Sequence, residues 1–298
     1  MKTLAVVVFY NPEGDYVSRC SLISKQVDKL VIYDNSTDHV IIEKNKSDVS
    51  DIPNVSYYSE GINKGIGAAL NYAAIEAEKG NFDFLLTFDQ DTLIPEDYVE
   101  RIISSYLSEK NIGVIGPVYK DINVSRECRF PVKAGPFILR KRLSGGSKLQ
   151  DVMVIISSGS LYPVSVFKVA GYFEEDYFID YIDNEYCLRL IKFGYRVCVD
   201  PKIIINHALG NRTVNKAILK FSPTNYPFYR KYYMTRNRLI VYKKYFFGFF
   251  SFVVYDFAAF LLDIFRVFLF ENDKKRKFSA YWLGFKDFIN GRRGAMGD

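Results

Sequence analysis

The segment Phe84-Leu-Leu-Thr-Phe88-Asp89-Gln-Asp91 places two carboxylates directly after a short apolar run. A continuous run of this kind predicts a strand buried on both faces, as in a parallel sheet covered by helices. Two aspartates separated by one residue can reach one divalent cation and the phosphate oxygens that it binds. An Asp-x-Asp pair is by itself more often a solvated turn or a helix cap. Its position after a buried strand favours the functional interpretation.

Strand and helix patterns alternate on both sides of this segment. We predict strands at 4–9, 30–33, 55–59, 84–88 and 112–115, and helices at 16–27, at 65–79 and from Pro95 onward. This alternation predicts an α/β fold with a mostly parallel, Rossmann-like sheet and flanking helices. Residues 120–150 are expected to form a loop or a short hairpin. Since ligands bind beyond the carboxyl ends of such strands, residues 34–38 and 89–91 should share one edge of the sheet.

Charge divides the chain into two parts. Residues 1–209 contain 28 acidic and 23 basic side chains, whereas residues 210–298 contain 17 basic and 6 acidic ones. We therefore expect a catalytic α/β region at 1–210 and a helical, basic and aromatic region at 211–298. A basic tail favours an anionic partner such as phospholipid, a lipid diphosphate or nucleic acid.

The cysteines and the N-terminus indicate a reducing compartment. The four cysteines form no Cys-x-x-Cys pair, so we expect neither a disulfide framework nor a structural zinc site. The apolar run after Lys2 is short and ends at a Tyr-Asn-Pro-Glu-Gly turn, which is typical of a first strand rather than a signal peptide.

Two further polar segments follow predicted strands. Asp34 opens Asp-Asn-Ser-Thr-Asp and could accept hydrogen bonds from a nucleotide base or a ribose, although an Asx or Ser/Thr turn explains it equally well. Asn63 and Gly65 lie in a glycine-rich entry to a helix. Such an entry can bind an anion through backbone amides, or can simply allow close packing.

Three carboxylates, Asp180, Asp183 and Glu185, lie near the beginning of another predicted helix. They could complement the helix dipole, or one of them could act as a general base. Ser158 and Gly159 precede a further helix and could line a pocket. A lone histidine after a strand, such as His207, is more often structural than a ligand.

Together these segments resemble glycosyltransferase family 2, the inverting enzymes with the GT-A fold, over about residues 3–240. Within that family they are most similar to bacterial rhamnosyltransferases of cell-surface polysaccharide synthesis. The resemblance lies in four motifs: Phe88-Asp-Gln-Asp91, Phe178-Ile-Asp-Tyr-Ile-Asp-Asn-Glu185, His207-Ala-Leu-Gly210 and Tyr232-Tyr-Met-Thr-Arg-Asn237.

The resemblance implies a role for each candidate residue. Asp183 would be the general base. The residues that would contact the nucleotide are Asp34, Asn63, Gly65 and Asp89, and those that would bind a Mg²⁺ or Mn²⁺ ion are Asp89, Asp91 and His207. The residues that would lie near the acceptor or diphosphate are Ser158, Gly159, Asp180, Glu185 and Arg236. The family often has Glu-Asp at the base position, whereas this chain has Ile182 there, which keeps Asp180 and Glu185 as alternatives. The implied donor is dTDP-L-rhamnose or else a UDP-sugar, and the implied acceptor is a lipid-linked or polysaccharide glycan.

Residues 246–270 form a mainly apolar stretch interrupted by Asp256, Asp263 and Arg266. On a helix these three positions form one narrow polar stripe. The stretch is predicted to lie in a membrane interface, with a protein interface or a membrane span as alternatives, because central charges make spanning costly.

We expect a peripheral protein at the cytoplasmic face of a bacterial membrane, with a homodimer left open. The aromatic residues of the tail are not interleaved with basic residues, which argues against binding of nucleic acid. Two rival functions are a non-catalytic scaffold that keeps the fold and a nucleotidyltransferase, which also uses paired carboxylates and a metal.

Overall fold

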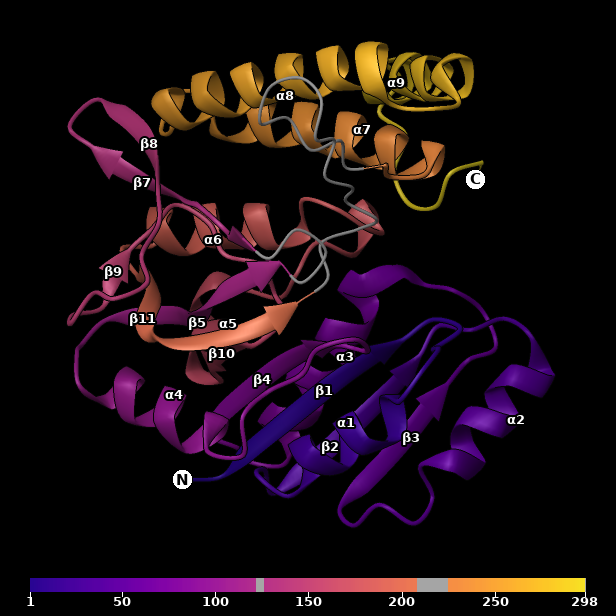
Figure 1. Cartoon of the computed structure of the whole chain (residues 1–298), viewed down its shortest axis with the longest axis vertical. Helices are drawn as coiled ribbons and strands as arrows, with labels where there is room; N and C mark the ends of the chain where they lie inside the picture. Colours follow the sequence, from indigo (N-terminus) through magenta and orange to yellow (C-terminus); the bar gives the residue numbers. More distant parts are fainter. Residues whose placement is uncertain (122–125, 208–224, 298) are drawn as a thin grey trace.

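One large sheet forms the centre of the N-terminal two thirds of the chain (Figure 1). The structure, a computed structural model, describes residues 1–121, 126–207 and 225–297. The strand order is β3-β2-β1-β4-β10-β5-β11-β9, with β6 paired to β5. The strands are β1 (Thr3–Phe9), β2 (Lys29–Asp34), β3 (Val55–Ser59), β4 (Phe84–Asp89), β5 (Ile112–Asp121), β6 (Arg126–Glu127), β9 (Gln150–Asp151), β10 (Ser160–Pro163) and β11 (Arg196–His207).

The sheet is mostly parallel, as predicted. Strands β1 to β4 run parallel, and β11 runs parallel to β5. Strand β10 is antiparallel to both of its neighbours, β4 and β5. The sequence did not predict β10, because its four residues are too short to show a period. Strand β10 begins directly after Ser158 and Gly159 and lies between β4 and β5, in the middle of the sheet.

Helices connect these strands and cover the sheet. They are α1 (Tyr16–Ser24), α2 (His39–Asp48), α3 (Gly65–Lys79), α4 (Tyr98–Leu107), α5 (Ser165–Ala170) and α6 (Ile182–Lys192), with a short 3₁₀ turn at Glu175–Tyr177. Asp15 and Asp38 cap α1 and α2 by accepting hydrogen bonds from Ser18 N and Val40 N. Helix α2 was not predicted, because its sequence is largely polar. The helix expected at Pro95 begins only at Tyr98, whose amide donates to the Pro95 carbonyl.

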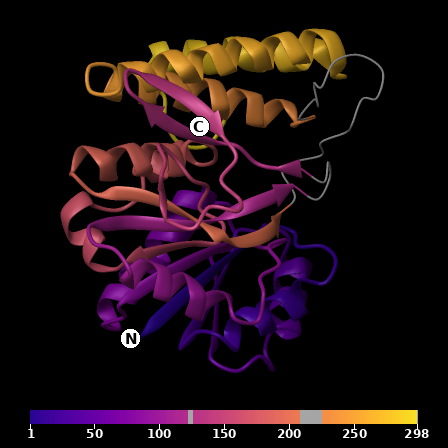
Figure 2. The same cartoon turned by 60° about the vertical axis from the view of Figure 1, so that its left-hand side comes forward.

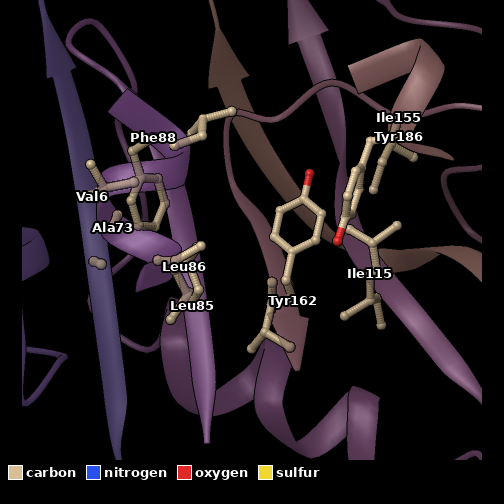
Figure 3. Packing of buried hydrophobic residues seen from close by; sticks show 14 of the residues in the cluster. Val6, Ala73, Leu85, Leu86, Phe88, Ile115, Ile155, Tyr162 and Tyr186 are labelled. Carbon is tan, nitrogen blue, oxygen red and sulfur yellow. The ribbon is translucent and has the colours of Figure 1, made fainter. Parts of the chain in front are cut away.

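The core lies between the sheet and these helices and combines aliphatic with aromatic side chains. Figure 3 shows Leu85 and Leu86 of β4 near Ala73 of α3, with Tyr162 of β10 beside Tyr186 of α6. The Tyr162 and Tyr186 rings lie 5.8 Å apart in an edge-to-face arrangement. This packing joins α6, and so the acidic residues at its N-terminus, to the strand next to β4.

The C-terminal region forms a layer of three helices at the top of Figures 1 and 2. These are α7 (Phe228–Tyr245), α8 (Phe250–Phe270) and α9 (Lys274–Ile289). A hairpin of β7 (Phe130–Ala134) and β8 (Phe137–Lys141) rises from the sheet region and reaches α8 (Figure 2). The hairpin agrees with the expectation for residues 120–150. The predicted boundary at residue 210 lies outside the described residues.

The apolar stretch in this layer forms α8, and its polar stripe faces the protein. Asp256 and Asp263 are both buried. Within the three described ranges, no helix is both long and apolar enough to cross a membrane.

Candidate active site

The two aspartates of the first motif lie where β4 ends and a tight turn begins. Asp89 is the last residue of β4, and its carbonyl accepts a hydrogen bond from Thr92 N. The Ser158 hydroxyl accepts a hydrogen bond from Asp89 N at 3.2 Å and lies 2.5 Å from the Thr92 hydroxyl. Ser158 is fully buried. Ser158 therefore stabilises the Asp89–Thr92 turn from the buried side, and its side chain does not line an open pocket.

Gly159 is required by close packing behind the same turn. Its φ of +75° is unfavourable for other residues, and a Cβ atom there would lie 2.9 Å from both the Tyr98 hydroxyl and Ile205 Cδ1. Its amide donates to the Thr87 carbonyl at 2.7 Å. Ser158 and Gly159 thus join β4 to β10 beside the aspartates.

The loop before α6 has a strained backbone. Phe178, Asp180 and Tyr181 have φ values of +64°, +63° and +67°. Such conformations are costly for these residues and persist only where the surroundings impose them. Two elements hold the loop: Ile66 N at the beginning of α3 donates to the Phe178 carbonyl at 2.8 Å, and the Asn237 amide of α7 donates to three carbonyls. Those acceptors are Tyr177, Ile179 and Asp180, at 2.8, 2.9 and 3.0 Å.

This loop delivers Asp183 to the first turn of α6, close to Asp89. Burial, together with the negative charges of Asp180 and Asp89, raises the pKa of Asp183 to about 6. Hydrogen bonds from the backbone amides of Asn184 and Ser157 oppose this shift. Asp183 as a whole residue is partly exposed. The fold therefore brings Asp89 close to Asp180 and Asp183, although Asp89 lies about ninety residues before them in the chain.

Arg230 is a site residue that the sequence did not predict. Its guanidinium makes a bidentate pair with the Asp180 carboxylate, through Nε at 3.1 Å and through a second, shorter contact. It also interacts electrostatically with Asp89 and stacks over the Tyr226 ring at 4.2 Å. The only signal in the sequence is its place two residues before the Tyr232 motif. Arg230 supplies a positive charge beside Asp180 and Asp89.

Asp34 and Gly65 are engaged inside the protein. Asp34 is fully buried, and its carboxylate accepts hydrogen bonds from Ser36 N, the Asn45 amide and the Tyr57 hydroxyl. Gly65 has a φ of +82°, and a Cβ atom there would lie 2.3 Å from the Phe178 carbonyl oxygen. The close-packing interpretation of the glycine-rich segment therefore explains Gly65.

Asn63 completes this turn. Its side-chain oxygen accepts a hydrogen bond from Gly65 N at 2.9 Å, and the residue remains partly exposed. The nucleotide contacts predicted for Asp34, Asn63 and Gly65 stay predictions, and the Asp34 carboxylate is the least accessible of the three.

Glu185 and Arg236 have structural surroundings, so we correct their expected place near the acceptor or diphosphate. Glu185 has no exposed surface and pairs with Arg189 and Lys244. Burial alone would raise the pKa of Glu185, but hydrogen bonds and charge from Arg189, together with Lys244, hold it below its usual value. Arg236 is also fully buried and donates to the carbonyls of Asp176, Tyr177 and Gly294. It therefore acts on the strained loop, and not directly on a ligand.

The carboxylates at the end of β4 have the chemistry of a divalent-cation site. Asp89 and Asp91 both keep partial exposure, and the repulsion that raises the pKa of Asp183 is of the kind that a cation relieves. A bridge between Leu93 and Asn206 brings the end of β11 beside the same turn. His207 is the last residue of β11, and its side chain lies outside what the structure describes. Among the described residues, no three His, Cys, Asp or Glu side chains form a complete metal-binding group.

Comparison with known proteins identifies the family of this site. Residues 5–171 match the model of glycosyl transferase family 2. The chain belongs to this family. It is also 30% identical over 247 residues to the dTDP-rhamnosyl transferase RfbF of Shigella flexneri, which covers 80% of this chain and 79% of that protein. The protein is therefore a glycosyltransferase of family 2 that resembles rhamnosyltransferases, as the motifs predicted.

Solved structures support the GT-A fold. The fragment 1–349 of S. aureus TarS, crystallised with UDP-GlcNAc, has a TM-score of 0.57 at 17% identity and covers 97% of this chain and 81% of its own. GalNAc-T7, crystallised with UDP, GalNAc and Mn²⁺, has a TM-score of 0.55 at 16% identity and covers 70% of this glycosyltransferase. This glycosyltransferase spans only 43% of the GalNAc-T7 chain.

Proposed function

We propose that this glycosyltransferase transfers L-rhamnose from dTDP-L-rhamnose to a hydroxyl of a lipid-linked or polysaccharide acceptor, with inversion at the anomeric carbon. The observation that carries the proposal is the position of Asp183 beside Asp89: it is a partly exposed residue whose carboxyl has a raised pKa. The likeness to the dTDP-rhamnosyl transferase supports the choice of donor. A UDP-sugar is the second candidate, because the TarS fragment of similar fold was crystallised with UDP-GlcNAc.

In this proposal Asp183 accepts the proton of the acceptor hydroxyl while the acceptor oxygen attacks the anomeric carbon. A carboxylate whose pKa lies near 6 is mostly ionised at neutral pH and is a stronger base than an ordinary aspartate. A single displacement inverts the configuration, so no nucleophilic carboxylate of the enzyme is needed. The ion pair between Asp180 and Arg230 lies beside Asp183, and the Arg230 guanidinium can attract the negatively charged diphosphate.

Asp91 and Asp89 would hold a Mg²⁺ or Mn²⁺ ion together with phosphate oxygens, and His207 would add a ligand from the end of β11. When bound, such an ion supplies positive charge that stabilises the diphosphate leaving group. The GalNAc-T7 structure with Mn²⁺ supports the use of a divalent cation in this fold.

A donor screen tests the proposal. Thermal unfolding is measured with dTDP, UDP, GDP and CMP, each with Mg²⁺ or Mn²⁺ and each with EDTA. We expect metal-dependent stabilisation that is largest for dTDP, because binding to the native state alone raises the unfolding temperature. Stabilisation by UDP alone would mean that the donor is a UDP-sugar and not dTDP-L-rhamnose. No response to any nucleotide would contradict a catalytic role and favour a non-catalytic scaffold.

Product analysis separates a glycosyltransferase from a nucleotidyltransferase. A glycosyltransferase releases nucleoside diphosphate from the donor, whereas a nucleotidyltransferase releases inorganic diphosphate. The anomeric configuration of the product, read by NMR, must be opposite to that of the donor. Retention of configuration would contradict the single displacement at Asp183.

A further inference from the structure

The helical layer buries most of its acidic side chains and leaves most of its basic side chains on the surface. Residues 225–297 contain five acidic side chains, of which four are buried. Asp256 pairs with Arg238 at 2.9 Å, Asp263 with Lys231 at 2.8 Å, and Glu271 with Lys277 at 2.8 Å. Asp287 accepts a hydrogen bond from the Tyr232 hydroxyl at 2.8 Å. The exposed charges are therefore almost all basic; they are Lys243, Lys244, Lys274, Lys275, Arg276, Lys286, Arg292 and Arg293, beside the acidic Asp273.

The same layer exposes an apolar face. On α8 the exposed side chains recur every three or four residues on the side opposite Asp256 and Asp263, and include Phe250, Val254, Phe257, Leu261, Phe265 and Phe268. On α9 they are Phe278, Trp282, Phe285 and Ile289. Phe247, in the turn that leads into α8, is 98% exposed. An apolar face of this size on a soluble surface marks an interaction site.

The β7–β8 hairpin adds the same chemistry next to α8 (Figure 2). Phe137 and Leu139 are exposed on β8. Residues 129–150 contain six basic side chains and no acidic one. Exposed aromatic and aliphatic side chains thus occur again among exposed basic ones.

From these contacts we propose that the outer face of α8 and α9, together with the β7–β8 hairpin, docks on an anionic phospholipid bilayer. Helix α8 lies along the bilayer surface in this arrangement, because its charged side is paired with α7 and α9. Apolar side chains enter the headgroup boundary, and the surrounding lysines and arginines meet lipid phosphates. A symmetric dimer through this face would bring the same basic residues of two copies together, which is unfavourable. An anionic bilayer surface is therefore the partner that fits.

Binding of the full chain to vesicles tests the proposal without any sugar nucleotide, so its outcome is independent of the donor. We expect co-sedimentation with vesicles of equal parts phosphatidylcholine and phosphatidylglycerol that falls as salt is added, and little with phosphatidylcholine alone. The double variant Phe257→Ser with Phe265→Ser should lower the partition coefficient roughly tenfold or more. Its control, Val40→Ser with Leu107→Ser, changes two exposed apolar residues on α2 and α4, outside the proposed face, and should bind as the original protein does.

Charge is tested separately. Lys275 and Lys286 are exposed on α9, on the side that carries Trp282. Lys275→Gln with Lys286→Gln should weaken binding to the anionic vesicles on the order of tenfold. The matched control is Lys46→Gln with Lys168→Gln, which removes the same charge from α2 and α5. Equal binding to both vesicle types, equal loss in the controls, or a stable dimer that the Phe257/Phe265 variant dissociates would each overturn the proposal.

Discussion

Two nitrogens of Arg230, on α7, donate hydrogen bonds to the Asp180 carboxylate. This ion pair connects the helical layer to the loop that precedes Asp183. Asp180 lies three residues before Asp183 and has a positive φ. The C-terminal helices therefore do more than cover the sheet. They also stabilise the backbone of the loop that positions Asp183, the proposed base.

Replacing Arg230 tests whether this pair serves catalysis. Arg230→Lys keeps the charge but cannot form the bidentate contact, because an ammonium is a single point donor. We expect kcat/KM to fall by about tenfold to a hundredfold, with a further loss in Arg230→Ala. Steady-state kinetics measure the effect, and Arg101→Lys on α4 is the control. Unchanged kinetics for Arg230→Ala would remove this residue from the site.

Asp183→Asn should abolish transfer, because an amide cannot accept the proton of the acceptor hydroxyl. The loss in kcat should be on the order of a hundredfold to ten-thousandfold, as is typical for a general base. Binding of dTDP with metal should stay within about twofold of the original value, since the proposed mechanism places Asp183 on the acceptor side. Calorimetric titration and a single-turnover assay read the two quantities. Retained turnover would move the base to another residue.

The same substitution should stabilise the fold at neutral pH. In the original protein the raised pKa of Asp183 means that the ionised carboxylate is less stable in the folded state than in the unfolded state. Asp183→Asn should therefore raise the free energy of unfolding by about 1–3 kcal/mol, toward the lower end because the residue as a whole is partly exposed. The gain should be complete above about pH 6, shrink as the pH falls toward 4, and disappear only below the unfolded pKa of 3.8, where the original carboxyl is protonated in both states. Urea unfolding at several pH values measures it. A gain that is the same at pH 4 and pH 7.5 would contradict the assigned pKa.

Asp91→Asn should weaken nucleotide binding only when metal is present. Removing one anionic ligand lowers the affinity for Mg²⁺ or Mn²⁺, and we expect the apparent Kd of dTDP with metal to rise by about tenfold or more. In EDTA the original protein and the variant should bind alike. The conservative control is Asp97→Asn, at an exposed position just before α4. An unaltered dependence on Mn²⁺ would remove Asp91 from the cation site.

Asn237→Ala should loosen the strained loop. The substitution removes three hydrogen bonds to the carbonyls of Tyr177, Ile179 and Asp180. We expect a loss of stability of about 1.5–4 kcal/mol and a fall in kcat larger than the change in KM. Asn272→Ala, at an exposed position after α8, is the control for both measurements. If kcat is retained despite the lower stability, the strained conformation is not needed for catalysis.

Helix α8 shows which features follow from the sequence pattern and which require the tertiary structure. Its sequence predicts one polar stripe on an apolar helix, and the structure confirms the stripe at Asp256 and Asp263. Only the fold shows what the stripe contacts, because Arg238 and Lys231 come from α7 and no local pattern links them to α8. The same limit applies to Arg236, which a sequence motif places in the site and the structure places behind it.

The sequence by itself determined the alternation of strands and helices, the carboxylates after β4 and the acidic beginning of α6, because these depend on periodicity and on neighbours in the chain. Only the tertiary structure decided that Asp89, Asp180 and Asp183 come together, that Arg230 joins them, and that Asp34 and Glu185 are enclosed by partners. The physical reason is that burial and charge at a site are set by groups distant in sequence. A carboxylate becomes a base, a ligand or a structural anion through those neighbours, and not through its own residue type.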